Sequence, residues 1–439
     1  MALCSPSPAE ALALAVDAAC WIEAQSVPLG NGRIWATAEG ASGDADVSLY
    51  RGAGGVVLFL IELAAATGDS SHLTRAREAT DAVLDHVTTN PLQAAGMYRG
   101  KSALAFVCQT LHEATGAQRY SVAARDEIAG VIDTAQTCGS GIGWLEPIPF
   151  ADSFDAHGET EIWDVSRGSA GVGMALLWAH DHALDRRCLD AASAIGRRLV
   201  EVATPTDAGL KWPMMLHDVG WWAPNFSHGT AGIAAFLAQL GRVSGDSRFV
   251  DAAEAAAKHL AAIATIDGQA RSILHSEGRS EALFYLGWCH GPPGTARLFY
   301  ELDAALGGDA WREWWVGGGE ALLSRGAPAT RSRGYWNNVG QCCGDAAIGE
   351  LALSLFGATG DPRFLAQARA IATHLGTGAR RNTDGASWVQ AEHRVQPDLL
   401  EAQTGYMQGA AGVGSFLLRL WAEETGHRIK TQLPDCPFP

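Results

Sequence analysis

The sequence has no surplus of basic residues. Its 439 residues include 32 Lys and Arg against 48 Asp and Glu, which gives a formal net charge of −16 at pH 7. A nucleic-acid-binding protein needs Lys and Arg to neutralise phosphates, and an anionic membrane surface attracts basic segments. We therefore expect neither nucleic acid nor a membrane surface as a partner.

Long apolar runs are also missing. The most apolar stretch, GGVVLFLIELAAA at 54–66, is too short to span a bilayer and contains Glu62. The N-terminal stretch MALCSPSPAEALALAVDAAC lacks the basic residues that precede the apolar part of a secretory signal. The sequence therefore predicts a cytoplasmic protein without membrane insertion.

The nine cysteines include no CxxC motif, which excludes a zinc ribbon. Their odd number and irregular spacing favour reduced thiols over a disulfide framework. The only adjacent cysteines are Cys342 and Cys343, directly before Gly344. We interpret this pair as metal ligands or as buried thiols.

What the sequence does contain is a short glycine motif that recurs seven times along the chain. Examples are YRGAGGV at 50–56, SHGTAGIA at 227–234 and CHGPPGTA at 289–296. The first glycines of the seven copies are Gly52, Gly100, Gly168, Gly229, Gly291, Gly344 and Gly409. Small residues suit a tight loop that enters a helix close to other loops, so most of these glycines are expected to be structural.

Two kinds of helix alternate around these motifs. An apolar stretch follows each motif, such as GIAAFLAQLGRVSGD at 232–246, and predicts a buried helix. Gly can end this helix, and Asp or Ser can cap the next one. The next segment, such as FVDAAEAAAKHLAAIA at 249–264, has apolar and polar positions at helical spacing and predicts an exposed outer helix.

Seven outer and inner pairs, from an outer helix at 8–25 to an inner helix at 416–426, predict an all-α fold. Because no polar capping repeat stands at either end, we expect a closed α/α toroid of seven inner and seven outer helices. No composition shift or linker divides the chain, so we expect a single domain over residues 1–439. The seven glycine loops would meet at one end of the ring, where a functional site is expected.

The residues directly before the first glycines would surround that end of the ring. They are Arg51, Arg99, Arg167, His228, His290, Cys343 and Gln408. Neighbouring repeats five and six bring two pairs of candidate metal ligands there, Cys289 with His290 and Cys342 with Cys343. Thiolate and imidazole are the ligands that zinc prefers, and three sulfurs with an open fourth position would suit a catalytic zinc. Ordinary buried cysteines are the alternative.

The motifs GWCHGPPG at 287–294, CCG at 342–344 and SHGTAG at 227–232 resemble those of the lanthionine synthetase C-like family. The resemblance covers nearly the whole chain and implies the α/α toroid of that family. It also implies a Zn²⁺ site whose ligands are Cys289, Cys342 and Cys343. Histidine is commoner at the last position, so the site resembles the three-cysteine variant of the family.

The resemblance implies further site residues. The catalytic histidine of the family matches His228, and an aspartate of its third repeat matches Asp164 in the motif WDVSRGSAG. Tyr285 stands where nisin-type members have an arginine, which puts a guanidinium role at that position in doubt. His290, Tyr285 and Arg167 are auxiliary candidates. Each has a structural alternative: Asp164 is a natural helix cap, His290 could satisfy a backbone carbonyl, and loop arginines often form surface ion pairs.

The implied activity is zinc-dependent addition of peptide cysteine thiols to dehydroalanine or dehydrobutyrine, which forms lanthionine or methyllanthionine thioether rings. His228 would protonate the α-carbon of the resulting enolate, because histidine titrates near neutrality, and Asp164 would orient it. The implied substrate is a precursor peptide that a separate dehydratase or kinase/lyase partner has dehydrated.

Other functions stay open. One is the addition of glutathione to dehydroamino acids in proteins, as in eukaryotic relatives of the family, and a glutathione requirement would distinguish it. Another is a non-catalytic peptide-binding scaffold of a biosynthetic complex, against which the presence of all the candidate ligands argues. A glycosidase of similar fold would need paired carboxylates at the loops, where only Asp164 and Asp345 stand close to the glycine motifs.

Overall fold

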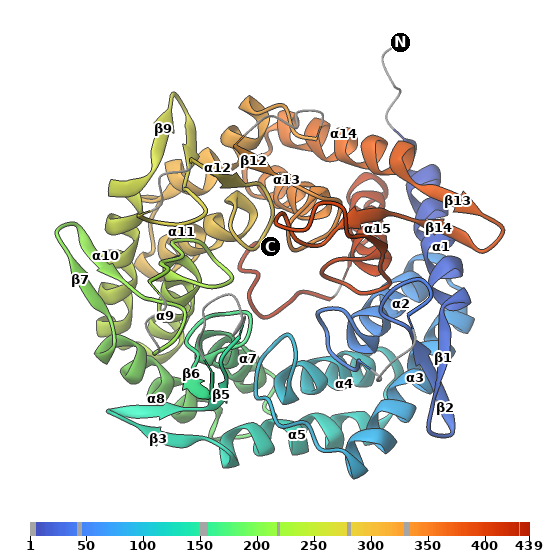
Figure 1. The fold of residues 1–439 in the computed structure, drawn as a ribbon, viewed down its shortest axis with the longest axis horizontal. Coiled ribbons are helices and arrows are strands. Elements are labelled where there is room, and N and C mark those ends of the chain that lie inside the picture. The colour runs from blue at the N-terminus through green and yellow to red at the C-terminus, as the bar shows by residue number, and fades with distance from the viewer. Residues whose placement is uncertain are drawn as a thin grey trace.

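The computed structural model describes residues 6–41, 46–149, 157–216, 220–278, 282–328, 334–429 and 431–439. Within these ranges, fourteen helices form an inner and an outer ring around a common centre (Figure 1). The predicted α/α toroid is therefore confirmed. Helix and strand labels follow Figure 1.

The inner ring consists of the helices that follow the glycine motifs. They are α2 (Ala53–Thr67), α4 (Lys101–Thr115), α7 (Ser169–Asp181), α9 (Thr230–Ser244), α11 (Pro292–Leu306), α13 (Asp345–Thr359) and α15 (Ala410–Thr425). The outer ring consists of α1 (Pro8–Ala24), α3 (Ser70–Thr89), α5 (Gln118–Asp133), α8 (Cys188–Glu201), α10 (Ser247–Ile263), α12 (Arg312–Ser324) and α14 (Pro362–Gly378). From α3 onward, each outer helix packs against the inner helix that precedes it in the sequence.

The first and last helices close the ring. The outer helix α1 packs against α15, and α15 also packs against the first inner helix, α2. A contiguous hydrophobic core extends from Ala11 in α1 to Phe438 near the C-terminus. Because the last repeat covers the first, no terminal repeat has to present a polar cap to solvent.

Burial and capping explain why the two kinds of helix alternate. In α2 every residue from Ala53 to Leu63 is buried, whereas the outer helices bury one face. Gly68 adopts a left-handed conformation and ends α2, and Asp69 begins α3 by accepting a hydrogen bond from the Ser71 N–H at 2.8 Å. Although α2 is strongly apolar, no helix of the described chain has the length and hydropathy that a membrane crossing requires.

Short two-stranded sheets connect the helices, and the sequence reasoning did not predict them. The antiparallel pairs are β1 (Ser26–Leu29) with β2 (Gly32–Trp35), β3 (Gln136–Cys138) with β4 (Gly141–Gly143), β5 (Leu145–Pro147) with β6 (Glu159–Glu161), β7 (Thr204–Thr206) with β8 (Gly209–Lys211), β9 (Thr265–Asp267) with β10 (Ala270–Ser272), β13 (Arg380–Asn382) with β14 (Gly385–Ser387), and β15 (Val389–Ala391) with β16 (Leu400–Ala402). The parallel pair is β11 (Phe284–Tyr285) with β12 (Tyr335–Trp336). Strands this short show too few residues for an alternating pattern to be recognised.

Backbone hydrogen bonds tie the glycine loops to one another around the centre of the ring. Each bond joins the residue two positions before the first glycine of one loop to the residue at the same position of the next loop. The N–H to carbonyl distances are 3.0 Å for Tyr50 to Tyr98, 3.1 Å for Ser166 to Ser227, 2.9 Å for Ser227 to Cys289, 2.9 Å for Cys289 to Cys342, 2.7 Å for Cys342 to Met407 and 2.8 Å for Met407 to Tyr50. The loops therefore meet at one end of the ring, as the repeat pattern predicts.

Candidate active site

Three cysteine side chains meet where the fifth and sixth glycine loops touch. The Sγ atoms of Cys289, Cys342 and Cys343 all lie within 4.8 Å of one another. The Sγ of Cys343 lies 3.3 Å from that of Cys289 and 3.6 Å from that of Cys342. All three residues are buried, and none of them is in a disulfide.

This thiol cluster fits a zinc ion in chemistry and in size. Zinc with sulfur ligands at ~2.3 Å in tetrahedral geometry separates the sulfurs by about 3.7 Å. This is close to the 3.3 Å and 3.6 Å between the Sγ of Cys343 and those of Cys289 and Cys342. The close approach of the two loops depends on Gly287, because a Cβ there would lie 2.4 Å from the carbonyl carbon of Cys343. With zinc bound, three protein thiolates would leave one tetrahedral position open.

The three thiols share their protons unequally. Hydrogen bonds from Cys289 and Cys343 hold the pKa of Cys342 well below its ordinary value, and the nearby His228 acts in the same direction. Burial, followed by the hydrogen bonds to its neighbours, raises the pKa of the Cys289 thiol. A negative charge on Cys342 is therefore stabilised by its neighbours.

Tyr50 adds a polar contact that the sequence reasoning missed. Its hydroxyl is hydrogen-bonded to Cys342, and Gln408 Nε2 donates to that hydroxyl at 3.2 Å. Asn338 Nδ2 in turn donates to Gln408 Oε1 at 3.2 Å. Burial raises the pKa of Tyr50 well above its usual range, so the phenol stays protonated and donates to the sulfur. Its position in the repeat could have pointed to it, because Tyr50 stands two residues before the first glycine of its loop, as Cys289 and Cys342 do in theirs.

His228 and Asp164 form a close pair from the third and fourth loops. His228 Nδ1 lies 2.6 Å from Asp164 Oδ2, and the Asp164 side chain is fully buried. The other carboxylate oxygen, Oδ1, accepts the backbone N–H groups of Arg167 at 2.7 Å and Gly168 at 2.9 Å. Asp164 is not the helix cap that the structural alternative proposed, because α7 begins after Gly168 without a side-chain cap. Its carboxylate instead stabilises the loop before the helix and orients the imidazole.

A cluster of rings lies beside the thiols. Ring centroids are separated by 5.6 Å between His228 and His290, 4.4 Å between His290 and His275, 4.4 Å between His275 and Tyr285, and 6.0 Å between Trp221 and His290. Burial, and then the charges of His275 and His228, hold the pKa of His290 well below its usual value, so its ring is neutral. Nδ1 of His290 is buried with no hydrogen-bond partner among the described residues. His275 lies outside the glycine motifs, so no sequence signal pointed to it.

Tyr285 at the end of β11 has a guanidinium beside it, supplied by another element. The Tyr285 hydroxyl is hydrogen-bonded to Arg394, which lies between β15 and β16. Burial, together with the nearby Cys343 and Cys289, raises the pKa of the phenol. The sequence comparison at position 285 alone could not have shown this contact, because Arg394 belongs to the seventh repeat.

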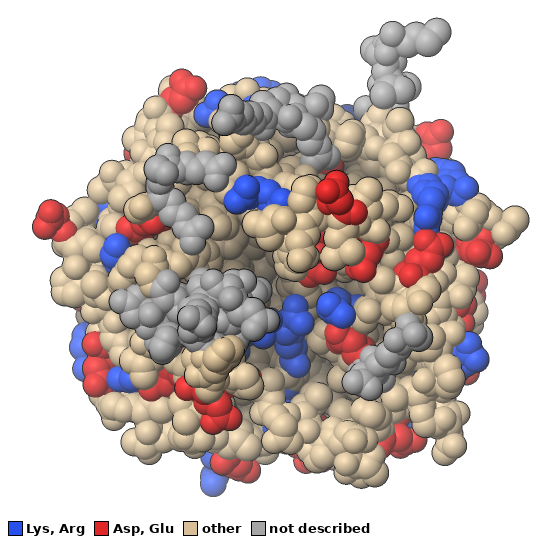
Figure 2. Space-filling view, viewed as in Figure 1, with Lys and Arg blue, Asp and Glu red and all other residues tan. Residues whose placement is uncertain are grey.

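The three loop arginines differ in their partners. Arg51 forms an ion pair with Asp46 at 3.2 Å, as expected for a loop arginine. The Arg99 guanidinium lies over the ring of Tyr50, with Cζ 4.4 Å from the ring centroid. Burial, and then the positive charge of Arg99, lower the pKa of Arg167. Figure 2 shows Lys and Arg atoms gathered at the central hollow of this face.

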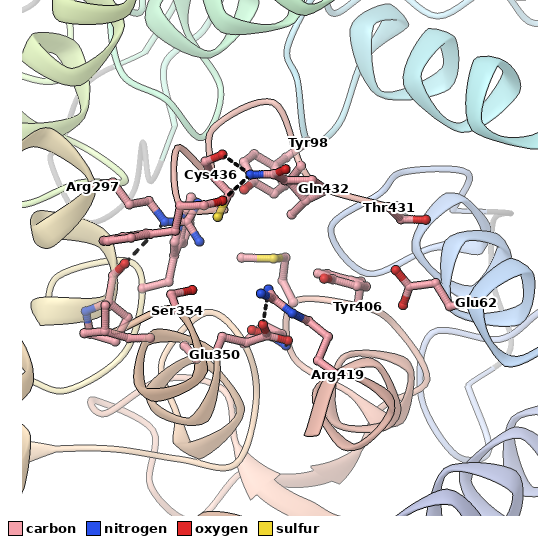
Figure 3. Close-up of a pocket in the computed structure, with 18 residues that line it drawn as sticks. Glu62, Tyr98, Arg297, Glu350, Ser354, Tyr406, Arg419, Thr431, Gln432 and Cys436 are labelled. Carbon is pink, nitrogen blue, oxygen red and sulfur yellow. Dashed lines mark hydrogen bonds and ion pairs between the residues drawn. The ribbon is translucent and has the colours of Figure 1, made fainter. Parts of the chain in front are cut away.

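The C-terminal segment enters the centre of the ring (Figure 1) and borders a cavity of about 50 Å³. Figure 3 shows Arg297, Glu350 and Arg419 around this cavity, with Gln432 and Cys436 of the segment on one side. Glu350 and Arg419 form an ion pair. The cavity belongs to the interior of the ring, and Trp288 and Met407 line it from the glycine loops.

The carboxylates of Asp164 and Asp345, which a glycosidase would need as a pair, each interact with other side chains. Asp164 contacts His228, whereas Asp345 accepts a hydrogen bond from Asn337 and lies 3.6 Å from His374. Both carboxylates are fully buried. Their contacts therefore give no support to a glycosidase site.

Solved structures with a similar fold include cyclases and hydrolases. The nisin cyclase structure aligns with a TM-score of 0.62 and 16% identity, over 88% of this chain and 90% of that chain. An unsaturated glucuronyl hydrolase specific for heparin aligns with a TM-score of 0.51 and 11% identity, over 97% of this chain and 99% of that chain. At these identities the likeness shows a shared fold.

The sequence comparisons point to one family. No curated protein matches the sequence significantly. The family model described as lanthionine synthetase C-like protein matches residues 43–430, which is most of the chain. The chain therefore belongs to the lanthionine synthetase C-like family.

Proposed function

We propose that the protein is a zinc-dependent lanthipeptide cyclase that adds peptide cysteine thiols to dehydroalanine or dehydrobutyrine. The observation that carries the proposal is the thiol cluster of Cys289, Cys342 and Cys343 beside a histidine–aspartate pair. Bound at the cluster, zinc would supply an open coordination position that favours loss of the proton from a substrate thiol at neutral pH.

His228 is the proposed proton carrier. Asp164 Oδ1 already accepts two backbone N–H groups, so the carboxylate acts as an acceptor and His228 Nδ1 donates to Oδ2. In the neutral ring, Nε2 therefore carries the free electron pair and can take a proton from the substrate thiol. Asp164 fixes this tautomer and stabilises the imidazolium that forms.

The proton and electron balance closes without a co-reactant. The substrate sulfur forms a bond to the β-carbon of the dehydro residue, and the electrons of the double bond move onto the α-carbon and carbonyl as an enolate. His228 then returns its proton to the α-carbon. One S–H bond and one C=C π bond are lost, and one S–C bond and one C–H bond are formed.

The surrounding rings support this chemistry by limiting water. Trp221, His290 and Tyr285 lie close to one another beside His228. His290 is buried and Tyr285 is half-buried. The neutral His290 adds no positive charge that would compete with His228 for the proton. A partly dry site strengthens the electrostatic effect of Asp164 on the imidazolium.

The proposed substrate is a dehydrated precursor peptide. Its dehydro residues require an earlier reaction, which we assign to a separate dehydratase or kinase/lyase partner. We also propose a cytoplasmic location and a single domain over residues 1–439.

A second candidate function is the addition of glutathione to dehydroamino acids in proteins. The observation that favours it is the set of arginines near the thiol cluster, since Arg99 contacts Tyr50 and Arg394 contacts Tyr285. Glutathione carries two carboxylates that such guanidinium groups could bind.

Zinc analysis tests the metal site directly. We expect about one zinc per chain in the wild-type protein and loss of the metal in Cys342→Ala. Cys20→Ser is the matched control, because Cys20 is an exposed thiol outside the cluster. A metal-free wild-type protein, purified under reducing conditions without chelator, would contradict both enzymatic candidates and favour a peptide-binding scaffold.

A peptide assay then separates the two enzymatic candidates. The substrate is a model peptide with one cysteine and one dehydroalanine, and mass analysis after thiol alkylation measures the loss of the free thiol. Ring formation without added glutathione supports the cyclase. A mass gain that depends on glutathione supports the second candidate.

A further inference from the structure

Exposed large apolar side chains gather on one hairpin of the ring. Of the nine such side chains in the described residues, four lie between residues 389 and 400, in β15, in β16 or in the loop that joins them. The three most exposed of these four are Val395 at 77%, Leu400 at 59% and Leu399 at 53%. Apolar side chains that cluster at the surface, rather than standing singly, mark an interaction site.

The register of this hairpin places apolar side chains on a common face. Val389 pairs with Ala402, and Ala391 pairs with Leu400. Because the side chains of paired residues, and of residues two positions apart on a strand, point to the same side, Val389 and Leu400 share one face. Both alanines are buried, so the exposed part of this face is formed by the two larger side chains.

The hairpin lies beside the thiol cluster. Asn338 Nδ2 donates to the carbonyl oxygen of Ala391 at 3.4 Å, and the Asn338 N–H donates to the carbonyl oxygen of Cys343 at 3.0 Å. Arg394, in the loop of the hairpin, is hydrogen-bonded to Tyr285 of the fifth repeat. The hairpin belongs to the seventh repeat, so it extends past the sixth glycine loop to reach the fifth repeat. In Figure 1 the chain between β14 and α15 folds inward toward the centre of the ring.

The exposed charge of the hairpin is negative. Arg394 contacts β11, and Glu392 has His393 beside it at 3.8 Å. Asp398 and Glu401 are exposed and form no ion pair with any described residue. Figure 2 shows Asp and Glu atoms beside the central hollow, on the same side of the ring as α15. Carboxylates next to exposed apolar side chains favour a partner that carries both apolar and basic residues.

We propose that this hairpin is a docking surface for the peptide substrate, and that it binds a segment of apolar and basic residues near the reacting cysteine. The residues of the docking surface are Val389, Val395, Asp398, Leu399, Leu400 and Glu401. The inference rests on the proposed function, because a peptide whose cysteine reaches the thiol cluster has to pass this hairpin. A folded protein seated there would obstruct the way to the cluster, whereas an extended peptide can lie on the hairpin and still place one side chain in the site.

Labelled peptides test the docking surface by binding rather than by activity. The first carries the segment Lys-Leu-Val-Lys-Leu-Val, the second Glu-Leu-Val-Glu-Leu-Val and the third Lys-Ser-Thr-Lys-Ser-Thr, each with blocked ends and a fluorophore. None contains cysteine, so a metal at the thiol cluster does not contribute to the affinity. Fluorescence anisotropy at low salt, where charge effects are least screened, measures the dissociation constants for the zinc-loaded protein.

We expect the wild-type protein to bind the basic apolar peptide about tenfold more tightly than either of the others. Val395→Ser combined with Leu399→Ser should remove most of the preference over the basic polar peptide. Asp398→Asn combined with Glu401→Gln should remove most of the preference over the acidic apolar peptide. All four side chains are exposed, so the zinc content of both variants should stay that of wild type.

The hairpin of β9 and β10 provides the matched control. Ile266 in β9 is 56% exposed, Asp267 next to it is also exposed, and Figure 1 shows β9 at the outer edge of the ring. Ile266→Ser combined with Asp267→Asn should therefore retain both preferences.

Equal affinities for the three peptides, or preferences that persist in both variants of the docking surface, overturn the proposal. A wild-type dimer that dissociates in the Val395→Ser and Leu399→Ser variant, as measured by sedimentation, assigns the surface to a second copy of the chain and overturns it as well.

The proposed function is tested separately, by ring formation in a model peptide that has one cysteine and one dehydroalanine but no apolar or basic segment. Ring formation without any preference among the labelled peptides overturns the docking surface and leaves the cyclase standing. A preference that depends on the hairpin, without ring formation, supports a peptide-docking surface and contradicts the cyclase.

Discussion

The indole Nε1 of Trp288 donates a hydrogen bond to Asp435 Oδ2 at 3.0 Å, and Trp288 directly precedes the candidate metal ligand Cys289. The same oxygen accepts the Tyr98 hydroxyl at 2.9 Å and pairs with Arg297 at 2.7 Å. The C-terminal segment thus holds the fifth glycine loop from inside the ring. Part of the support for the candidate metal centre lies outside the seven repeats.

Asp435→Asn tests this support. We expect the free energy of unfolding to fall by about 3 kcal/mol, because the largely buried Arg297 would lose its charged partner. Urea denaturation of the metal-free protein measures the change. Asp267→Asn is the control, since Asp267 is exposed in β9, and it should change stability by less than ~0.5 kcal/mol. Equal stability of Asp435→Asn and wild type would show that the contact is energetically neutral.

Asp164→Asn should separate proton transfer from metal binding. The side-chain oxygen of asparagine can still accept the N–H groups of Arg167 and Gly168, so its NH2 group would face His228 Nδ1. That contact favours the tautomer with the proton on Nε2, which cannot accept a proton from the substrate.

We expect the single-turnover rate of ring formation in Asp164→Asn to fall about 100-fold or more, with zinc content unchanged. The tautomer can be read from the ¹⁵N shifts of the His228 ring. A wild-type rate in a variant with the altered tautomer would remove His228 Nε2 from the mechanism.

Tyr50→Phe removes the hydroxyl that donates a hydrogen bond to Cys342, and it keeps the aromatic ring that contacts the Arg99 guanidinium. Hydrogen bonds from outer residues orient metal ligands, and their loss typically costs 10–100-fold in metal affinity. We therefore expect zinc to bind about tenfold or more weakly, as measured by competition with a chromophoric chelator. Tyr335→Phe, in β12, is the control and should bind zinc as wild type does. Equal affinity in both variants would mean that the Tyr50 hydroxyl does not support the ligand.

The fold was largely predictable because its signals are local and repeated. The glycine at the start of each inner helix and the Gly-Asp sequence between helices, such as Gly68 and Asp69, depend on backbone conformation and capping within a few residues. The closed ring was predicted because neither end of the repeat series carries a polar capping repeat. The short hairpins were missed, since their few residues carry no periodicity.

The candidate site was predictable where its residues share a position in the repeated loops or match a family motif. His228, His290 and Cys343 directly precede the recurring glycines, and Cys289 and Cys342 stand one residue earlier, so the repeat alignment brought them together. Asp164 was predicted from the family motif. His275 and Arg394 lie outside the motifs, and they reach the site through the packing of segments between repeats. Contacts of this kind depend on how the connecting segments fold back over the ring, which single-sequence patterns do not encode.

The buried carboxyl group of Glu62 makes stability depend on pH. Burial, and then the negative charge of Glu350, raise the pKa of Glu62 to about 8, whereas an unfolded glutamate titrates near ~4.3. Between these values the folded protein binds more protons than the unfolded chain, so the free energy of unfolding falls as the pH rises.

Glu62→Gln replaces the protonated carboxyl by a neutral amide and should remove this dependence. From pH 5 to pH 8.5, we expect the free energy of unfolding of the variant to rise by roughly 4 kcal/mol relative to that of wild type, because about three pH units of linked protonation, at ~1.36 kcal/mol each, are removed. Urea denaturation at the two pH values measures the gain. Glu401→Gln, at an exposed position of β16, is the control and should follow the wild-type profile. Parallel profiles for Glu62→Gln and wild type would show that Glu62 is already ionised in the folded protein at pH 5, with Arg419 as the nearby cation that stabilises it.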